Sequence, residues 1–386
     1  MAGDKLRLLL VTARYLPHIG GTEVHTYEVA RRLAAAGHDV TVLTTMSGEQ
    51  SPSAERTDRV QVLRVPAWPA NRDYYFSPGI YRAITRGTWD VIHCQGYHTL
   101  VPLVAMLAAW RSKTPYVVTF HSGGHSSRVR NALRGLQRAL LRPLLARADL
   151  LIGVSQFEAD LFQRALQLPK ERFIVIPNGC YLPTPSPPTV MLNEGPLIVS
   201  IGRLERYKGH HRVIEALPRL EQVYPGLRLR VVGTGPYEAT LRKMAHALGV
   251  ADRVEFQTIP VADRHGMASV LLRAALVILL SDYESQGISV LEALALGRPV
   301  LVADTSVLRD LAQEGLVRAT PLGSTPEQLA QAVETQLRQP LVPPIVNLPS
   351  WDACADQLLG VYRSVVQAAR AHPHGNTRVL PPVPGI

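Results

Sequence analysis

The sequence predicts an α/β protein with two doubly wound domains, each built on a parallel sheet. Apolar, strand-like runs alternate with helix-like stretches along nearly the whole chain, a pattern typical of parallel sheets covered by helices. A Pro-rich segment without any period, residues 181–196, interrupts this alternation and is typical of a linker. At 386 residues the chain also exceeds the usual size of one hydrophobic core, so two domains are expected.

The first domain is predicted over residues 1–185. An apolar run at residues 6–11 leads into a Gly-Gly turn and a helix, which we expect Thr22 to cap and Gly37 to end. Further strand-like runs follow, and they read DVTVLTT, VQVLRV, DVIHC, YVVTF, DLLIGVS and FIVIPNG.

The second domain is predicted over residues 186–365, where the alternation restarts. Its strand-like runs are LIVSIG, LRLRVVG, RVEF, ALVILL and RPVLVA, with helices expected from about Lys208 and from Pro236. A helix predicted at about 352–370 can pack back on the first domain, and residues 371–386 are expected to be a disordered tail. The carboxyl ends of the two sheets are expected to border a cleft, where open α/β sheets bind ligands.

Composition points to a cytoplasmic globular protein. The three cysteines, Cys94, Cys180 and Cys354, lie far apart and form no metal-binding or disulfide pattern, so no metal and a reducing compartment are expected. The N-terminal apolar run is too short for a signal peptide, and no later apolar run is long enough to span a membrane.

The basic excess is concentrated in the first half of the chain. Residues 1–185 hold 22 Lys and Arg against 13 Asp and Glu, while the whole chain holds 41 against 31. Residues 126–147 contain six arginines and no acid, and four of the arginines recur at helical spacing: Arg130, Arg134, Arg138 and Arg142. The apolar side of the same helix would hold Leu133, Leu136, Leu140 and Leu144. Such a helix can lie on an anionic membrane surface, or it can be a solvated face whose leucines pack into the domain.

Two groups of residues after predicted strands could bind phosphate. Gly20 and Gly21 would let a phosphate approach backbone N–H groups at a helix start, although a Gly-Gly pair is often only a turn. Arg203 and Lys208 leave the first strand of the second domain, where two cations could clamp a diphosphate without a metal. The alternative is a pair of exposed basic residues in a loop.

Two glutamates flank a third candidate phosphate site, in the stretch ESQGISVLE. Gly287, Ile288 and Ser289 would begin a helix and point their N–H groups at the expected cleft. Glu284 precedes this turn and Glu292 lies in the helix. Carboxylates accept hydrogen bonds from sugar or ribose hydroxyls, so both could hold a polyol beside a phosphate. The apolar surroundings of Glu292 predict a buried helix, where an unpaired carboxylate would be costly.

His121 follows the strand-like run at residues 116–120, at the end that would face the cleft. A lone histidine is often structural, and both a structural and a functional interpretation stay open for this one.

Together these stretches resemble retaining glycosyltransferases of the GT-B fold, of the family 4 type also called glycosyl transferases group 1. The resemblance covers nearly all of residues 5–370. It rests on GGTEVHTYEVARRLAAAGHDVTVLT, TFHSGG, VSQFEADLF, VIPNGC, SIGRLERYKGHHRVIEALPRL, LRLRVVGTGPYEATLRKMA and ESQGISVLEALALGRPVLVAD. The chain departs from the family at Gln286, where an aromatic residue is usual, and at residues 256–258, which read FQT where FLG is frequent.

The resemblance implies a role for each candidate residue. Glu292 would hold the nucleotide ribose and Glu284 the donor sugar, while Arg203 and Lys208 would bind the diphosphate. Further contacts to phosphates or sugar hydroxyls would come from Gly20, Gly21, Gly287, Ile288 and Ser289. His121 would lie near the reacting sugar, and Gly233 and Gly235 would shape a loop near the nucleotide.

The function implied is transfer of a sugar from a UDP or GDP sugar to a hydroxyl of a glycan, lipid-linked or small-molecule acceptor, with retained anomeric configuration. The first domain would bind the acceptor and the second the nucleotide-sugar, with the linker as hinge. No metal, other cofactor or nucleic acid is implied, and an anionic membrane at the inner face of the plasma membrane is a possible partner. A nucleotide-sugar epimerase and a non-catalytic nucleotide-binding subunit remain as alternatives.

Overall fold

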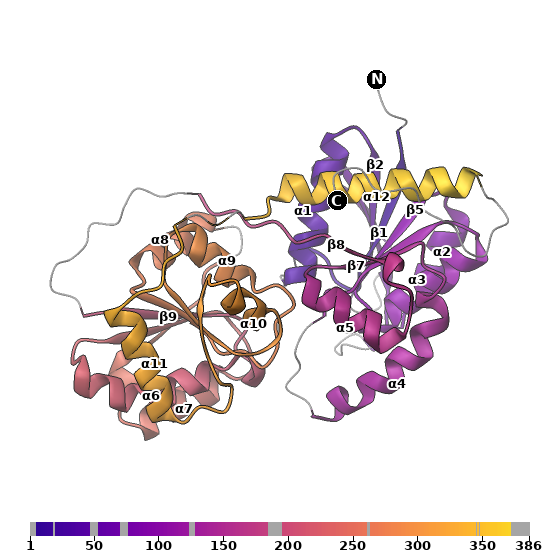
Figure 1. Ribbon diagram of the computed structural model, residues 1–386. Coiled ribbons are helices and arrows are strands. Elements are labelled where there is room, and N and C mark those ends of the chain that lie inside the picture. The colour runs from indigo at the N-terminus through magenta and orange to yellow at the C-terminus, as the bar shows by residue number, and fades with distance from the viewer. Residues whose placement is uncertain are drawn as a thin grey trace. The chain divides into compact units, whose positions relative to one another are not determined.

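The chain forms two compact units in the computed structural model (Figure 1). The model describes residues 5–17, 20–46, 53–69, 76–122, 128–183, 195–260, 263–344, 346 and 348–371, except for the side chains of residues 128–134. The first unit includes described residues up to Ser122, then 132–179 and the stretch from Pro349, and the second includes 180–348. The second domain therefore ends near Leu348 and not at residue 365, and the predicted disordered tail lies outside the described residues.

The first unit is built on a mostly parallel sheet of eight strands in the order β3-β4-β2-β1-β5-β6-β7-β8. The strands are β1 (Arg7–Val11), β2 (Asp39–Met46), β3 (Ser53–Thr57), β4 (Val60–Pro66), β5 (Val91–Gln95), β6 (Tyr116–Thr119), β7 (Leu150–Gly153) and β8 (Phe173–Val175). Only β3 pairs antiparallel, with β4. The central strands are buried on both faces, which explains their continuous apolar runs.

Helices cover both faces of this sheet. They are α1 (Gly21–Ala35), α2 (Pro78–Arg86), α3 (Leu100–Arg111), α4 (Arg128–Leu145), α5 (Gln156–Leu166) and α12 (Trp351–Ala371), with a 3-10 turn at η1 (Lys170–Arg172). The expected Thr22 cap is wrong. Helix α1 already begins at Gly21, so Thr22 lies inside its first turn, and Gly20 occupies the N-cap without a side-chain hydrogen bond.

Helix α12 belongs to the first unit although it ends the described chain. Figure 1 shows it in yellow beside α1, and its residues Leu358, Val361 and Val365 are fully buried in the core shared with β1 and β2. The hydroxyl of Tyr362 also lies 2.5 Å from Nδ1 of His93 on β5. The last helix of the described chain therefore completes the core of the N-terminal unit.

The second unit is a parallel sheet of six strands in the order β11-β10-β9-β12-β13-β14. The strands are β9 (Leu197–Ile201), β10 (Arg228–Val232), β11 (Val254–Gln257), β12 (Leu276–Leu279), β13 (Val300–Ala303) and β14 (Arg318–Thr320). Since the chain builds outward from β9 in one direction and then in the other, the topological switch point lies between β9 and β12. Doubly wound sheets bind ligands at the carboxyl ends of their strands at such a point.

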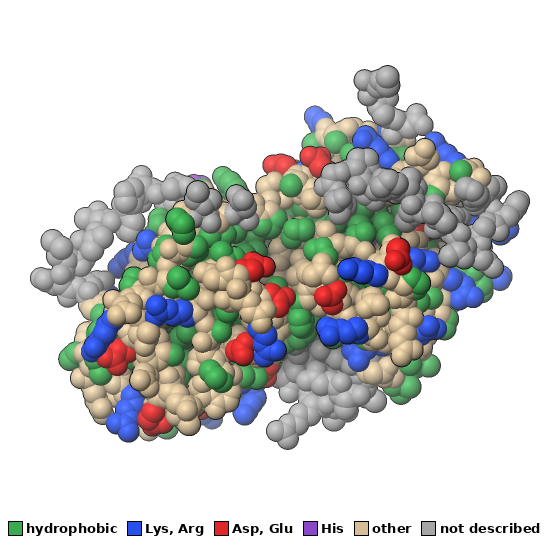
Figure 2. Space-filling model, viewed as in Figure 1, with side chains coloured by type: hydrophobic (Ala, Val, Ile, Leu, Met, Phe, Trp, Pro, Cys, Tyr) green, Lys and Arg blue, Asp and Glu red, His purple; other side chains and the backbone are tan. Residues whose placement is uncertain are grey.

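Helices follow most strands of the second unit. They are α6 (His210–Val223), α7 (Glu238–Ala247), α8 (Arg264–Arg273), α9 (Ile288–Ala295), α10 (Ser306–Gln313) and α11 (Pro326–Arg338), with 3-10 turns η2 (Arg206–Lys208) and η3 (Ala251–Arg253). The helices expected from about Lys208 and Pro236 begin slightly later, at His210 and Glu238. Acidic and basic side chains are interspersed on the face of this unit seen in Figure 2, at the left, which fits its nearly balanced charge.

We predict that Leu358→Ala destabilises the first unit by about 2–5 kcal/mol, because it leaves a cavity where α12 meets the sheet. Urea unfolding followed by tryptophan fluorescence can measure this, since the four tryptophans all lie in the first unit: Trp68, Trp89, Trp110 and Trp351. As a control, Leu140→Ala at an exposed leucine of α4 is expected to change the stability by about 0.5 kcal/mol or less. Equal effects of the two changes would contradict the packing of α12.

Candidate functional site

In the second unit the predicted donor residues gather at the carboxyl ends of three neighbouring strands. Gly202 and Arg203 follow β9, Gly233 follows β10, and Glu284 comes soon after β12. Because the three strands are parallel and adjacent, these loops lie at the same edge of the sheet, at the switch point.

Gly233 and Gly235 allow two loops at this edge to touch through their backbones. A Cβ on Gly233 would lie 2.0 Å from the carbonyl oxygen of Gly202, and one on Gly235 would lie 2.4 Å from that of Leu204. Gly233 also has a φ of +150°, which side chains disfavour. The two glycines therefore hold the loop after β10 against the backbone that carries Arg203.

A largely buried ion pair joins the loops after β9 and β12. Nζ of Lys208 donates to Oε1 of Glu284 at 2.6 Å, and Ser281 Oγ donates to the same oxygen at 2.7 Å. Burial opposes the charge on Lys208, but the nearby Glu284 outweighs it and raises the lysine pKa. Lys208 is therefore charged at neutral pH, and the pair connects the two sides of the switch point.

Glycine at position 209 makes this pairing possible. It has a φ of +76°, and a Cβ there would lie 2.0 Å from the carbonyl oxygen of Leu280. The chain after Lys208 therefore passes directly against the end of β12, and Arg212 donates to the same Leu280 oxygen at 2.6 Å.

Arg203 has different surroundings from Lys208. Its side chain is 63% exposed and pairs with Glu205 at 2.9 Å. Its backbone is fixed by His210, whose Nε2 lies 3.2 Å from the Arg203 carbonyl oxygen and whose Nδ1 lies 2.8 Å from Ser200 Oγ. Burial lowers the pKa of His210 to about 4, so this ring is neutral and holds the loop by hydrogen bonding alone. The sequence did not single out His210.

Helix α9 begins at Ile288, one residue later than expected, with Gly287 as its N-cap and Ile288 and Ser289 in its first turn. Gly287 adopts a left-handed φ of +70° and provides no side-chain acceptor for the first N–H groups of the helix. The backbone of Glu284 is held nearby, because its N–H donates to Ser306 Oγ at 2.9 Å. This turn has the features of an anion-binding helix start.

Glu292 is buried in α9 and forms an ion pair with Arg264, the first residue of α8. Arg264 also donates to the carbonyl oxygen of Tyr181 at 2.9 Å. Burial raises the pKa of Glu292, and Arg264 opposes this shift. The expectation of a buried helix is confirmed, whereas the partner was missed, because nothing in the sequence around Arg264 relates it to Glu292.

In the first unit, His121 lies just after β6 with a strained, positive φ of 43°. Its Nε2 lies 2.7 Å from Oε1 of Gln95, at the end of the adjacent β5. Burial, followed by the nearby His25, lowers its pKa well below the ordinary value, so the ring is neutral. The next residue, Ser122, donates its N–H to the buried Glu158 at 2.6 Å, which anchors the turn.

The two glycines at the start of α1 differ in their surroundings. A Cβ on Gly21 would have nothing within 4 Å, whereas one on Gly20 would lie 2.5 Å from Oε2 of Glu23. A carboxylate therefore already lies beside this helix start, where negative charge is favourable. The predicted phosphate contact of Gly20 and Gly21 stays a prediction.

The arginine-rich helix α4 has a different buried face from the one expected. Leu141 and Leu145 are buried, while Leu136 and Leu140 are 58% and 71% exposed. Arg142 is exposed, and its Nε donates to the carbonyl oxygen of Leu166 at 2.8 Å. The side chains of Arg130, Arg134 and Leu133 lie outside the described residues. Leu136 and Leu140 therefore face outward, while Leu144 is half-buried against the core. Of the two alternatives that the sequence left open, packing of the leucine row into the domain is wrong for Leu136 and Leu140.

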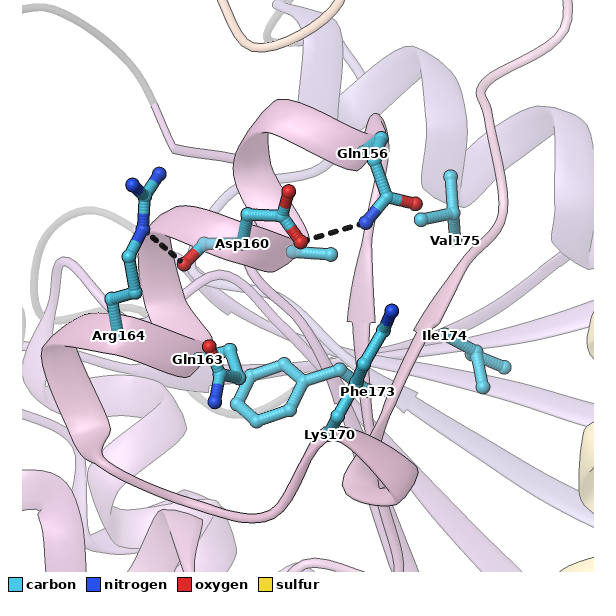
Figure 3. A pocket seen from close by; sticks show the side chains of 9 residues that line it. Gln156, Asp160, Gln163, Arg164, Lys170, Phe173, Ile174 and Val175 are labelled. Carbon is cyan, nitrogen blue, oxygen red and sulfur yellow. Dashed lines mark hydrogen bonds between the residues drawn. The ribbon is translucent and has the colours of Figure 1, made fainter.

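The first unit also has a cavity of about 580 Å³ between α5 and β8 (Figure 3). Gln156, Asp160 and Arg164 line it from α5, and Phe173 and Val175 line it from β8. Gln156 Nε2 donates to Asp160 Oδ1 at 2.7 Å, as the dashed line in Figure 3 shows. The lining includes none of the candidate catalytic, donor-binding or membrane-contact residues that the sequence predicted.

Among the described residues, His, Cys, Asp and Glu form no cluster of three or more that could hold a metal ion. No helix within the described ranges is both long and apolar enough to cross a bilayer.

Comparison with known proteins agrees with this architecture. A model described as Glycosyltransferase Family 4 matches residues 19–182, and one described as Glycosyl transferases group 1 matches residues 188–344. The chain is 29% identical to a glycogen synthase of Mycobacterium tuberculosis, covering 87% of each protein. It is 30% identical to a D-inositol 3-phosphate glycosyltransferase of Xylanimonas cellulosilytica, covering 75% of this chain and 76% of the relative.

Solved structures show the same fold. A sucrose-phosphate synthase from Thermosynechococcus elongatus aligns with a TM-score of 0.74 at 21% identity, covering 94% of this chain and 99% of the other. Anabaena HepE, solved in complex with UDP and glucose, aligns with a TM-score of 0.67 at 18% identity, covering 95% and 99%. The fold is thus the two-domain GT-B arrangement of glycosyltransferases. The chain belongs to the glycosyltransferases of group 1, and it is a sugar-transferring enzyme.

We predict that Lys208→Met destabilises the second unit by about 3–5 kcal/mol, because it leaves the buried Glu284 carboxylate without its cation. Far-UV circular dichroism during urea unfolding measures the effect. The matched change Arg203→Met, at an exposed cation of the same loop, is expected to cost about 0.5 kcal/mol or less. Adding Glu284→Gln to Lys208→Met is expected to restore part of the loss, and no recovery would argue against the pair as its cause.

Proposed function

We propose that this enzyme is a retaining glycosyltransferase that moves a sugar from a UDP or GDP sugar to a hydroxyl of an acceptor. The acceptor would be a glycan, a lipid-linked sugar or a small molecule, in the synthesis of a cell-envelope glycan or exopolysaccharide. The observation that carries the proposal is a pair of carboxylates in the second unit, the largely buried Glu284 and the buried Glu292, each of which forms an ion pair with a cation. Family membership favours transfer over the epimerase and the non-catalytic alternatives.

The donor would bind to the second unit at the switch point. The N-terminal turn of α9 would take a phosphate through its N–H groups, and Lys208 and Arg203 would contact the diphosphate. Glu292 would accept hydrogen bonds from the ribose hydroxyls and Glu284 from the donor sugar. Relatives support this class of donor, since HepE has been solved with UDP-glucose.

Retention would follow a route in which the acceptor attacks from the face that the diphosphate leaves. The departing phosphate oxygen would take the acceptor's proton, while Arg203 and Lys208 stabilise the negative charge that develops on the diphosphate. No metal is required in this scheme, because the two cations supply the electrostatic stabilisation. Glu284 already accepts hydrogen bonds from Lys208 and Ser281, which favours a binding role over that of a covalent nucleophile.

Nucleotide binding tests the donor site. We expect one of UDP, GDP and ADP to bind the wild-type protein in the micromolar range by calorimetry. Glu292→Ala is expected to lose at least about tenfold in affinity, or about 1.4 kcal/mol, because the ribose loses its carboxylate partner. Glu255→Ala, at an exposed glutamate on β11 of the same unit, serves as the control and should leave the affinity unchanged. Equal binding by wild type and Glu292→Ala would show that the site is placed wrongly.

Turnover tests the diphosphate clamp. We expect Arg203→Ala to lower kcat by roughly a hundredfold or more, because a charge that stabilises the leaving group is lost. Arg203 is exposed, so the fold should be unaffected, and Arg206→Ala at the exposed neighbour serves as the control. The rate of nucleotide release in the presence of acceptor is the measurement. Near-normal kcat in Arg203→Ala would remove this residue from the mechanism.

We further propose that α4 contacts an anionic membrane at the inner face of the plasma membrane. The exposed Leu136 and Leu140 would enter the lipid interface while the arginines, including Arg138 and Arg142, contact the headgroups. This arrangement would bring the enzyme to a lipid-linked acceptor.

Vesicle sedimentation tests the membrane contact. We expect the protein to bind vesicles of phosphatidylcholine and phosphatidylglycerol and to bind pure phosphatidylcholine weakly. Leu136→Ser combined with Leu140→Ser should lower binding to the anionic vesicles by at least about tenfold, since the two apolar side chains that would enter the lipid interface are lost. Val223→Ser, at an exposed valine of the second unit, should have no effect. Unchanged binding by the double variant would contradict the contact.

A further inference from the structure

His25 is a buried histidine on α1 that none of the proposed donor contacts uses. Its side chain is 1% exposed, and its ring lies against that of His121 in an edge-to-face arrangement with centroids 4.5 Å apart. It is therefore the aromatic neighbour of the residue expected near the reacting sugar.

The hydrogen bonding of His25 fixes its chemical form. Its Nδ1 lies 2.6 Å from Oδ1 of Asn178, and because a carbonyl oxygen can only accept, Nδ1 carries the proton. Burial lowers the pKa of His25 to about 4, so the ring is neutral and Nε2 holds a lone pair. That nitrogen is buried without a hydrogen-bond partner in the structure. Packing alone would be better served by an apolar ring such as phenylalanine, which has no unpaired nitrogen to bury.

The partners of His25 come from the two places where the chain passes between the units. Asn178 and Gly179 are the last residues of the first unit before the chain leaves it, and Trp351 lies two residues after the chain returns at Pro349. The ring of Trp351 lies 6.0 Å from that of His25, also edge to face. A Cβ on Gly179 would lie 2.2 Å from the backbone nitrogen of Trp351, so the two crossing segments pack directly on each other.

We infer that His25 is a positioning residue for His121. Through His25, the orientation of the His121 ring depends on the two segments that cross between the units. A hydrogen bond from one crossing segment and a ring contact from the other hold His25. Its ring in turn limits the rotation of His121, which is held on another side by Gln95. The inference rests on the proposed function, since the orientation of His121 matters for transfer only if this residue lies near the reacting sugar.

Histidine-selective NMR of the free protein tests the positioning without any substrate. In the wild type we expect one neutral tautomer of His121 with its proton on Nε2, the nitrogen that faces Gln95 Oε1; His121→Gln identifies its signals. In His25→Ala these signals should shift toward the average of the two tautomers, because the ring gains freedom to rotate. His38→Ala removes another buried histidine of the same unit and should leave them unchanged.

A second variant keeps the test valid if His25→Ala folds poorly. His25→Asn keeps an N–H donor for Asn178 and removes the ring, so the His121 signals should shift here as well. Unchanged His121 signals in a folded His25 variant would overturn the inference.

Kinetics separates this inference from the proposed function. His25→Ala should lower kcat by roughly tenfold in the wild-type background and by less than about twofold in His121→Ala, because it acts through that residue. The KM for the nucleotide-sugar should change less than about twofold, since the donor contacts lie in the second unit. Equal falls in kcat in both backgrounds would overturn the positioning role. Full activity of His121→Ala would instead contradict the role of His121 and leave the NMR result standing.

Discussion

The ion pair between Lys208 and Glu284 is the interaction on which the arrangement of the loops at the carboxyl ends of the second unit's strands depends. It joins the loop after β9 to the loop after β12, and both charges are largely buried, so neither is tolerated without the other. The features around it follow from that constraint. Gly209 lets the chain pass against the end of β12, Ser281 shares the carboxylate oxygen, and Ser306 holds the Glu284 backbone.

The same ion pair contributes to the charge balance of the proposed donor site when no ligand is bound. Glu284 and Glu292 each form an ion pair with a cation, while Arg203 is largely exposed and pairs with the nearby Glu205. A diphosphate would therefore meet one solvent-accessible guanidinium and a helix start, beside an ammonium group that a carboxylate already holds. An arrangement of this kind would favour an anion at the proposed donor site without leaving an uncompensated charge there when no ligand is bound.

Much of the fold could be predicted from the sequence, because strand and helix patterning is local. The parallel sheets, the restart near residue 196 and the helix that begins after Gly287 all follow from short stretches. The features that could not be predicted from the sequence are contacts between distant segments. Arg264 reaches Glu292 and His25 reaches Asn178 across 28 and 153 residues, and no local pattern relates such partners. The predicted Thr22 cap of α1 is wrong, and the sequence left open whether the leucines of α4 pack into the domain, because tertiary packing and not propensity decides both.

The return of α12 to the first sheet has a consequence for biosynthesis. The second unit is inserted between β8 and α12, so the ribosome completes the whole second unit before it makes the helix that covers the first. Until then the apolar face beside α1 lacks Leu358 and Tyr362, and the nascent first unit exposes it. Exposed apolar surface of this kind recruits chaperones or aggregates. A chain truncated before residue 351 would keep every strand of both sheets and still lack a closed N-terminal core.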